Sequence, residues 1–241
     1  MKTVLVTGGS GGIGAAVCRA FAEKGYAVAV HAFSHREEGE GLAAELRKKG
    51  AEAHCFSADL RSLGDCERLV AEVSAKFGKI DVLVNNAGAA LVKLFSECTE
   101  EDYDEIMDLN LRAAVRLTRL VLPGMLGRGF GRIVNVSSIW GQSGASCEAI
   151  YSASKAGLIG FTQALGKELA RTGVLVGGVA PGATDTRMNR GLGKETLASL
   201  AEEIPAGRLA FPEEIAACVL FLAEESAFLM GQILSPNGGW L

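Results

Sequence analysis

Residues 2–14 read Lys-Thr-Val-Leu-Val-Thr-Gly-Gly-Ser-Gly-Gly-Ile-Gly, and this stretch decides the fold class. The β-branched run at residues 3–7 predicts a strand, and residues 13–23 follow a helical pattern. Glycines between a first strand and a first helix let backbone N–H groups approach a phosphate closely, beside the positive end of the helix dipole. The setting therefore predicts a turn that binds a pyrophosphate, with an ordinary structural glycine loop as the alternative.

The order of strand followed by helix repeats along the whole chain. Short β-branched or apolar runs predict strands at residues 3–7, 27–33, 53–57, 81–84, 132–137, 174–180 and 232–234. Helical patterns occupy residues 13–23, 38–49, 63–77, 101–126, 151–171 and 212–224. Several strands are apolar throughout, as expected when helices cover both faces of a parallel sheet. We therefore predict an α/β fold, a doubly wound and mostly parallel sheet of about seven strands, in a single domain over residues 1–241.

Composition excludes several classes of protein. The net charge of −4 is spread without a basic stripe, so nucleic acid is not an expected partner. No run of apolar residues is long enough to span a membrane and no apolar signal region opens the chain, so we expect no membrane partner and a cytoplasmic location. The six cysteines form no Cys-x-x-Cys pair and only three histidines are present, so we expect free thiols and no metal site.

The end of the second predicted strand bears on the choice of ligand. A carboxylate about twenty residues beyond the glycines would bind a ribose 2′-hydroxyl and repel a 2′-phosphate. This strand is followed by Ser34, His35 and Arg36 instead. These side chains can contact a phosphate, which favours NADP(H) over NAD(H), or they are simply solvated loop residues.

Tyr151 and Lys155 are four residues apart at the start of a helical stretch, so their side chains lie on one face. A tyrosine has an ordinary pKa of about 10, and a nearby ammonium would lower it toward the range useful for proton transfer. Ser138 follows an apolar strand and therefore lies at a carboxyl end of the sheet, where ligands bind in such folds. These three residues predict a proton-transfer site.

With these motifs the chain resembles a short-chain dehydrogenase/reductase over essentially its whole length. Thr7, Gly8, Gly12 and Gly14 match the family's Thr-Gly-x-x-x-Gly-x-Gly turn, and residues 85–88 match its Asn-Asn-Ala-Gly segment. The resemblance implies a Rossmann fold and hydride transfer between a nicotinamide dinucleotide and a carbonyl or alcohol. It implies catalytic roles for Asn110, Ser138, Tyr151 and Lys155.

By the same resemblance, Asn110 would hold a water that links Lys155 to solvent, and Lys155 would also bind the nicotinamide ribose. Asp59-Leu60 would contact adenine, and Pro181-Gly182 with Thr186 would hold the nicotinamide carboxamide. The residues expected to bind the cofactor are Gly8, Ser10, Gly11, Gly12, Ile13, Gly14, Ser34, His35, Arg36, Asp59, Leu60, Asn86, Ala87, Gly88, Tyr151, Lys155, Pro181, Gly182 and Thr186.

Two positions depart from the family pattern. Many relatives that use NADP carry a basic residue inside the glycine turn, where this chain has Gly11. The family's C-terminal Asp-Gly-Gly is replaced by Asn237-Gly238-Gly239. The first departure weakens the argument for NADP(H), which we nevertheless favour.

In length and the absence of extra domains, the chain resembles bacterial 3-oxoacyl-acyl-carrier-protein reductases. Residues 90–95 and 138–148 look more like a narrower relative, the elongation factor P 5-aminopentanone reductases. Glu148 would pair with the amine of such a substrate, or it is a solvated loop residue. The substrate is therefore expected to be a small or carrier-bound ketone. A dinucleotide-binding sensor without turnover is the alternative of another class.

Residues 187–208 interrupt the strand–helix rhythm with glycines, a polar helical piece and Pro205. We interpret this segment as a lid over the substrate, with a plain surface helix as the alternative. The resemblance further implies a homodimer or homotetramer assembled through the helices at residues 101–126 and 151–171.

Overall fold

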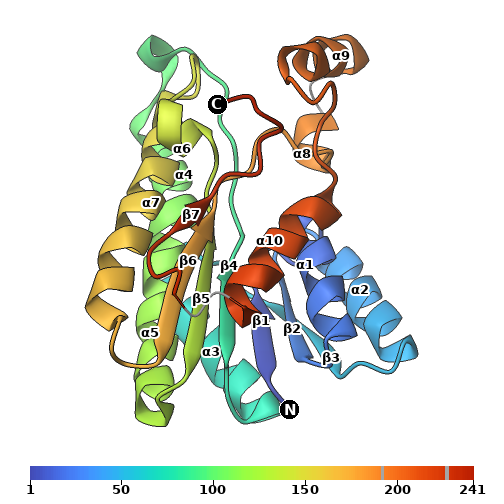
Figure 1. The fold of residues 1–241 in the computed structure, drawn as a ribbon, viewed down its shortest axis with the longest axis vertical. Helices are drawn as coiled ribbons and strands as arrows, with labels where there is room; N and C mark the ends of the chain where they lie inside the picture. Colours follow the sequence, from blue (N-terminus) through green and yellow to red (C-terminus); the bar gives the residue numbers. More distant parts are fainter. Residues whose placement is uncertain (191–192, 226–227) are drawn as a thin grey trace.

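The computed structural model describes residues 1–190, 193–225 and 228–241. One sheet of seven strands, ordered β3-β2-β1-β4-β5-β6-β7, forms the centre of the molecule (Figure 1). Every neighbouring pair is parallel. The strands are β1 (Thr3–Val6), β2 (Ala27–Ala32), β3 (Ala53–Ser57), β4 (Val82–Asn85), β5 (Gly131–Val136), β6 (Val174–Val179) and β7 (Ile233–Leu234). The predicted α/β, doubly wound, single-domain fold is confirmed.

Helices cover both faces of the sheet (Figure 1). One core packs the sheet against α1, α2 and α10, and the other packs it against α3, α5 and α7. The main helices are α1 (Gly12–Glu23), α2 (Arg36–Lys48), α3 (Leu63–Phe77), α4 (Glu100–Met107), α5 (Ala113–Arg128), α7 (Ala149–Leu169) and α10 (Pro212–Glu224). Shorter helices are α6 (Trp140–Ser143), α8 (Arg187–Arg190) and α9 (Lys194–Glu203).

The strands are apolar because both of their faces are buried. In β1, Val4 and Val6 belong to the core beneath α1, whereas Leu5 between them belongs to the core beneath α3 and α5. Successive side chains of a strand point to opposite faces, so an alternating polar strand would place polar groups in one of the two cores. This double burial is the physical reason that the strand runs are continuous.

The predicted helix at residues 101–126 is not one regular helix. A π-helical turn (Asp108–Arg112) separates α4 from α5 and contains Asn110. Such turns insert one extra residue into an α-helix and occur often at functional sites. A helical hydrophobic pattern continues across a single extra residue, so sequence periodicity alone missed the interruption.

The strand order reverses between β1 and β4, which places the switch point of this doubly wound sheet at their carboxyl ends. Helices α8 and α9 stand beyond this same end of the sheet (Figure 1). They belong to the predicted lid, whose residues 191–192 lie outside the described residues. Closure of this segment stays a prediction. In the described part of the chain, no helix combines the length and the apolarity that a membrane crossing requires.

Candidate active site

The glycine turn, residues 7–14, connects β1 to α1 with backbone conformations that favour glycine. Gly8 and Gly12 have positive φ values of +62° and +51°. At Gly14, an added Cβ would lie 2.1 Å from the Gly8 carbonyl oxygen, so only glycine fits there. Helix α1 begins at Gly12 with no side chain capping its N-terminus. Its first N–H groups therefore have no side-chain partner and can bind an anion.

Neighbouring residues hold the glycine turn against the carboxyl end of β4. The Thr7 hydroxyl donates to the Val84 carbonyl at 3.2 Å and accepts from the N–H groups of Asn86 and Ala87 at 2.9 and 3.0 Å. The Asn86 side-chain amide donates to the carbonyls of Thr7 and Gly8 at 2.9 and 3.2 Å. Through these hydrogen bonds the Asn-Asn-Ala-Gly segment holds the glycine turn in its conformation.

His31 also supports the glycine turn, although it was not among the residues predicted from the sequence motifs. Its Nδ1 accepts from the Gly8 N–H at 3.1 Å, and its Nε2 lies 3.0 Å from the Ala58 carbonyl. These partners require the neutral ring with its proton on Nε2. Burial accordingly lowers the pKa of His31. A lone histidine inside an apolar strand was the signal that could have identified it.

Acidification is expected to destabilise the protein through His31. Because folding lowers the pKa of this ring, its contribution to stability is present above the unfolded pKa of about 6.5 and is lost as the pH falls through the folded pKa. Protonation would also place a hydrogen on Nδ1, so that this atom could no longer accept the hydrogen bond from the Gly8 N–H. Urea unfolding followed from about pH 7.5 to about 5.5 should show this loss, and His31→Gln should reduce it.

The exposed His54 on β3 provides the matched control. His54→Gln should retain the pH dependence of the wild-type protein. An equal dependence in His31→Gln and the wild type would show that another group is responsible.

A cleft of about 540 Å³ opens above the glycine turn. It brings together residues from the turn, from the carboxyl ends of β4 and β5, from α7 and from the start of α8. The cofactor residues predicted from the sequence that line this main cleft are Gly8, Ser10, Gly11, Gly12, Ile13, His35, Asn86, Ala87, Gly88, Tyr151, Lys155 and Thr186. Arg187 and Met188, which were not predicted, also line it.

The remaining predicted residues lie outside the lining of the main cleft. Gly14 packs against Gly8, and Leu60 is buried at 2% exposure. The Asp59 carboxylate is bound by Arg61 at 2.9 Å, and that guanidinium lowers the pKa of the carboxyl. Ser34 is exposed. Ser138, Pro181 and Gly182 line an adjoining pocket.

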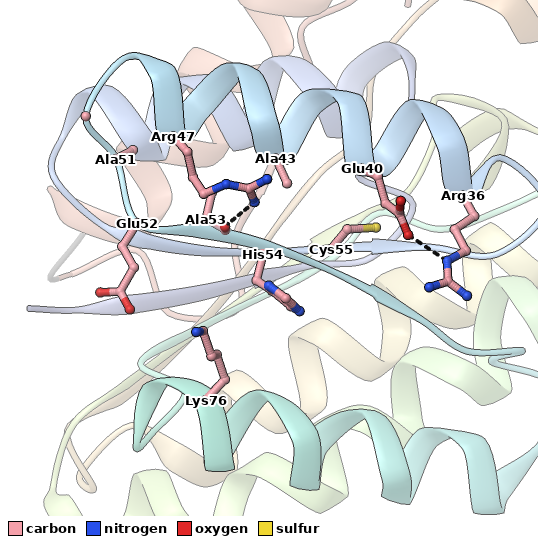
Figure 2. Close-up of a pocket in the computed structure, with 11 residues that line it drawn as sticks. Arg36, Glu40, Ala43, Arg47, Ala51, Glu52, Ala53, His54, Cys55 and Lys76 are labelled. Carbon is pink, nitrogen blue, oxygen red and sulfur yellow. Dashed lines mark hydrogen bonds and ion pairs between the residues drawn. The ribbon is translucent and has the colours of Figure 1, made fainter.

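Arg36 is directed elsewhere. Figure 2 shows its guanidinium turned to Glu40 over an open groove between α2, β3 and α3, with an Nε–Oε1 distance of 2.8 Å. Here its partner is an exposed carboxylate four residues along the same helix. The expectation that Arg36 contacts a phosphate is therefore not supported by its position.

Tyr151 lies where the main cleft meets the adjoining pocket, and it lines both. Ser138 lines the adjoining pocket with it and lowers the pKa of its hydroxyl. The Lys155 ammonium lies 5.8 Å from the centre of the tyrosine ring and donates to the Val136 carbonyl at 3.0 Å. The three predicted residues are thus grouped beside the glycine turn.

The expected fall in the pKa of Tyr151 is not found. Burial raises this pKa above its ordinary value, Ser138 partly offsets the rise, and Glu148 adds to it. Burial also lowers the pKa of Lys155 to about 8. Burial is the largest cause of both shifts, and the raised pKa of Tyr151 favours the protonated phenol.

Asn110 is buried in the π turn, with 1% exposure, and its side chain is fully engaged. The Oδ1 accepts from the Ala89 N–H at 2.9 Å, while Nδ2 donates to the Ala89 carbonyl and to Ser154 Oγ at 2.9 and 3.0 Å. Gly88 separates this amide from Lys155, because a Cβ on Gly88 would lie 3.0 Å from Asn110 Oδ1 and 3.3 Å from Lys155 Nζ. Asn110 thus positions the strand end beside the lysine, and its predicted water contact stays a prediction.

The adjoining pocket, with a volume of about 300 Å³, is named the tryptophan pocket after Trp140 and Trp240. These two rings meet edge to face with centroids 5.0 Å apart. Val92 and Leu200 add apolar surface, and Glu148 is the one charged side chain in the described lining. Burial raises the pKa of Glu148. The pocket therefore combines an aromatic surface, a carboxylate and the Ser138–Tyr151 pair.

Comparisons with known proteins agree with this arrangement. The sequence model of the short chain dehydrogenase family matches residues 2–197. Acetoacetyl-CoA reductase of Allochromatium vinosum is 40% identical, covering 99% of this chain and 98% of its own length. A 3-oxoacyl-[acyl-carrier-protein] reductase of Staphylococcus epidermidis is 36% identical over 99% of this chain and 98% of its own length. The crystal structure of an actinorhodin polyketide ketoreductase variant with NADPH superposes with a TM-score of 0.95 at 38% identity, covering 99% of this chain and 97% of the other.

Proposed function

The chain belongs to the short-chain dehydrogenase family and is an oxidoreductase, and we propose that it reduces a ketone to a secondary alcohol with NADPH. The observation that carries this proposal is the position of Tyr151 at the junction of the main cleft and the tryptophan pocket. A group that lines both spaces can contact a nicotinamide on one side and a carbonyl on the other. Proton transfer requires the tyrosine hydroxyl to lie within hydrogen-bonding distance of the carbonyl oxygen.

The residues of the main cleft fit a nicotinamide dinucleotide. Positive φ values at Gly8 and Gly12 keep the turn tight, and the uncapped start of α1 offers N–H groups to a pyrophosphate. Tyr151 and Lys155 would contact the nicotinamide riboside, with Thr186 near the carboxamide. When bound, the reduced dinucleotide supplies the hydride.

The side chains of this protein supply the proton. The hydroxyls of Ser138 and Tyr151 bind the carbonyl oxygen, and the raised pKa of Tyr151 keeps its proton in place until negative charge develops on that oxygen. Tyr151 then donates the proton, and the Lys155 ammonium stabilises the resulting phenolate. The ketone gains one hydride on carbon and one proton on oxygen, which makes the alcohol.

A 3-oxoacyl thioester, carried on an acyl-carrier protein or on coenzyme A, is the substrate class that we favour. The relatives named acetoacetyl-CoA reductase and 3-oxoacyl-[acyl-carrier-protein] reductase support it, as does the apolar surface of the tryptophan pocket. Steady-state assays with acetoacetyl thioesters should show NADPH oxidation matched by 3-hydroxyacyl product. Tight NADPH binding without reduction of any ketone in a broad panel would instead support the non-catalytic sensor.

Glu148 supports a second candidate substrate, the aminopentanone modification on elongation factor P. A partly buried carboxylate in a pocket that also contains two aromatic rings can bind an ammonium ion, through charge and through cation–π contacts with Trp140 and Trp240. The described lining contains no cationic side chain that would neutralise this carboxylate. A ketone bearing a free amine would therefore match the pocket.

Glu148→Gln separates the two candidates. If the substrate is an aminoketone, the substitution should lower kcat/KM for it at least about tenfold, because a charge-assisted contact is lost. Reduction of an acetoacetyl thioester should be unchanged or improved. Glu97→Gln, on an exposed turn outside the pocket, is the matched control. Equal effects of Glu148→Gln on both substrates would assign Glu148 a structural role.

A further inference from the structure

Arg187, the first residue of α8, lines the main cleft and lies beside the glycine turn. Its Nη2 lies 3.1 Å from the point where a Cβ on Gly11 would be, and its Cζ lies 4.0 Å from that point. The guanidinium therefore occupies the space that a side chain at position 11 would enter. A cation thus reaches the glycine turn from a different segment of the chain.

The same guanidinium binds a carboxylate at the start of α2. Arg187 Nη1 lies 3.0 Å from Glu38 Oε1, and His35 Nδ1 lies 3.5 Å from the same oxygen. Both side chains of the Arg187–Glu38 pair are about half exposed, at 57% and 48%. Exposed ion pairs contribute little to stability, so this one can be exchanged for another anion at small cost.

The Arg187–Glu38 pair lies in the part of the fold that receives the adenosine ribose of a dinucleotide. In doubly wound folds the adenosine ribose lies at the carboxyl end of the second strand, where its 2′ substituent is recognised. Here β2 ends at Ala32, and the next segment contains His35 and, in the first turn of α2, Glu38. Arg187 and His35 therefore place a guanidinium and an imidazole around one anionic oxygen, that of Glu38, in the segment that follows the second strand.

Resting on the proposed function, we propose that Arg187 is the residue that binds the 2′-phosphate of NADPH, and that Glu38 is the competing anion that Arg187 releases when NADPH binds. A guanidinium forms paired, charge-assisted hydrogen bonds to phosphate, whereas a 2′-hydroxyl would leave Arg187 on Glu38. The two residues therefore set the preference between NADPH and NADH in opposite directions. Gly11 leaves the space that Arg187 needs.

Binding of each dinucleotide to the purified protein, measured by titration calorimetry without substrate, tests this assignment. Arg187→Gln should weaken NADPH binding at least tenfold and change NADH binding less than twofold. Glu38→Gln should strengthen NADPH binding several-fold and leave NADH binding unchanged or weaker. Arg19→Gln removes a similar exposed pair, with Glu45, on the α1–α2 surface and should change neither affinity.

Three results would overturn the inference. If Arg187→Gln lost affinity for NADPH and NADH equally, the guanidinium would instead bind the pyrophosphate that both dinucleotides contain. Wild-type NADPH affinity in Arg187→Gln would exclude any phosphate contact. Loss of NADPH binding in Arg36→Gln, with Arg187→Gln unchanged, would transfer the role to Arg36. A wild-type protein that binds neither dinucleotide would contradict the proposed function itself.

Discussion

Tyr151→Phe is expected to lower kcat for ketone reduction by about 10²- to 10⁴-fold while leaving NADPH affinity within about twofold. The substitution removes one hydroxyl and keeps the ring that lines both cavities. Without this hydroxyl, no described residue that lines both cavities has a side chain acidic enough to protonate the carbonyl oxygen as it gains charge. Ser138 can still donate a hydrogen bond, but its hydroxyl is a much weaker acid.

The pKa of Tyr151 bears on whether the residue acts in ketone reduction or in alcohol oxidation. The sequence suggested an acidified phenol, whereas burial raises the pKa and favours the protonated form. A reductase needs the protonated form at neutral pH, so the observed direction suits reduction. Lys155, with a pKa lowered to about 8, is charged at neutral pH and can stabilise the phenolate after transfer.

Tyr103→Phe is the matched control for Tyr151→Phe. Tyr103 lies on α4 with 46% exposure, and removal of its hydroxyl should leave steady-state turnover unchanged. Unchanged kcat in Tyr151→Phe, with NADPH binding intact, would exclude Tyr151 as the proton donor.

Gly14→Ala is expected to weaken NADPH binding by about a hundredfold, because it displaces the glycine turn. The new methyl would lie 2.1 Å from the Gly8 carbonyl oxygen and 2.7 Å from the Asn86 side-chain amide. Neither group can move without breaking the contacts that hold the turn on β4. Titration calorimetry measures the loss, and circular dichroism establishes that the variant is folded.

Gly41→Ala tests the same substitution where space is open. Gly41 lies within α2, and an added Cβ there meets nothing within 4 Å. This variant should bind NADPH like the wild type and gain up to about 1 kcal/mol in unfolding free energy, because alanine favours helix. A folded Gly14→Ala protein with unchanged NADPH affinity would contradict the assigned role of the glycine turn.

Strand and helix order could be predicted from the sequence because the sheet is buried on both faces. The continuous apolar runs at Val4 and Val82 belong to strands with a helix layer above and below, and this environment leaves a clear pattern. The π turn around Asn110 could not be predicted, because one inserted residue barely alters the hydrophobic period.

The candidate site could be predicted where a local motif specifies the backbone. Gly12 and Lys155 lie in motifs of fixed spacing, and both line the main cleft. Contacts between segments that are distant in the sequence leave no motif of fixed spacing. The pairing of Arg187 with Glu38 spans 149 residues, and the support of Gly8 by His31 depends on how β2 pairs with β1. Arg36 was selected by its position after a strand, but its side chain pairs with Glu40 over a groove outside the main cleft.

Hydride delivery to the carbonyl carbon is tested most directly with NADPH that carries two deuterium atoms at C4. Wild-type protein, incubated with this NADPH and an acetoacetyl thioester, should yield a 3-hydroxy product with one deuterium on the carbinol carbon, detected by mass spectrometry. Product without deuterium, or no product from either an acetoacetyl thioester or an aminoketone with protein that binds NADPH, would contradict the account.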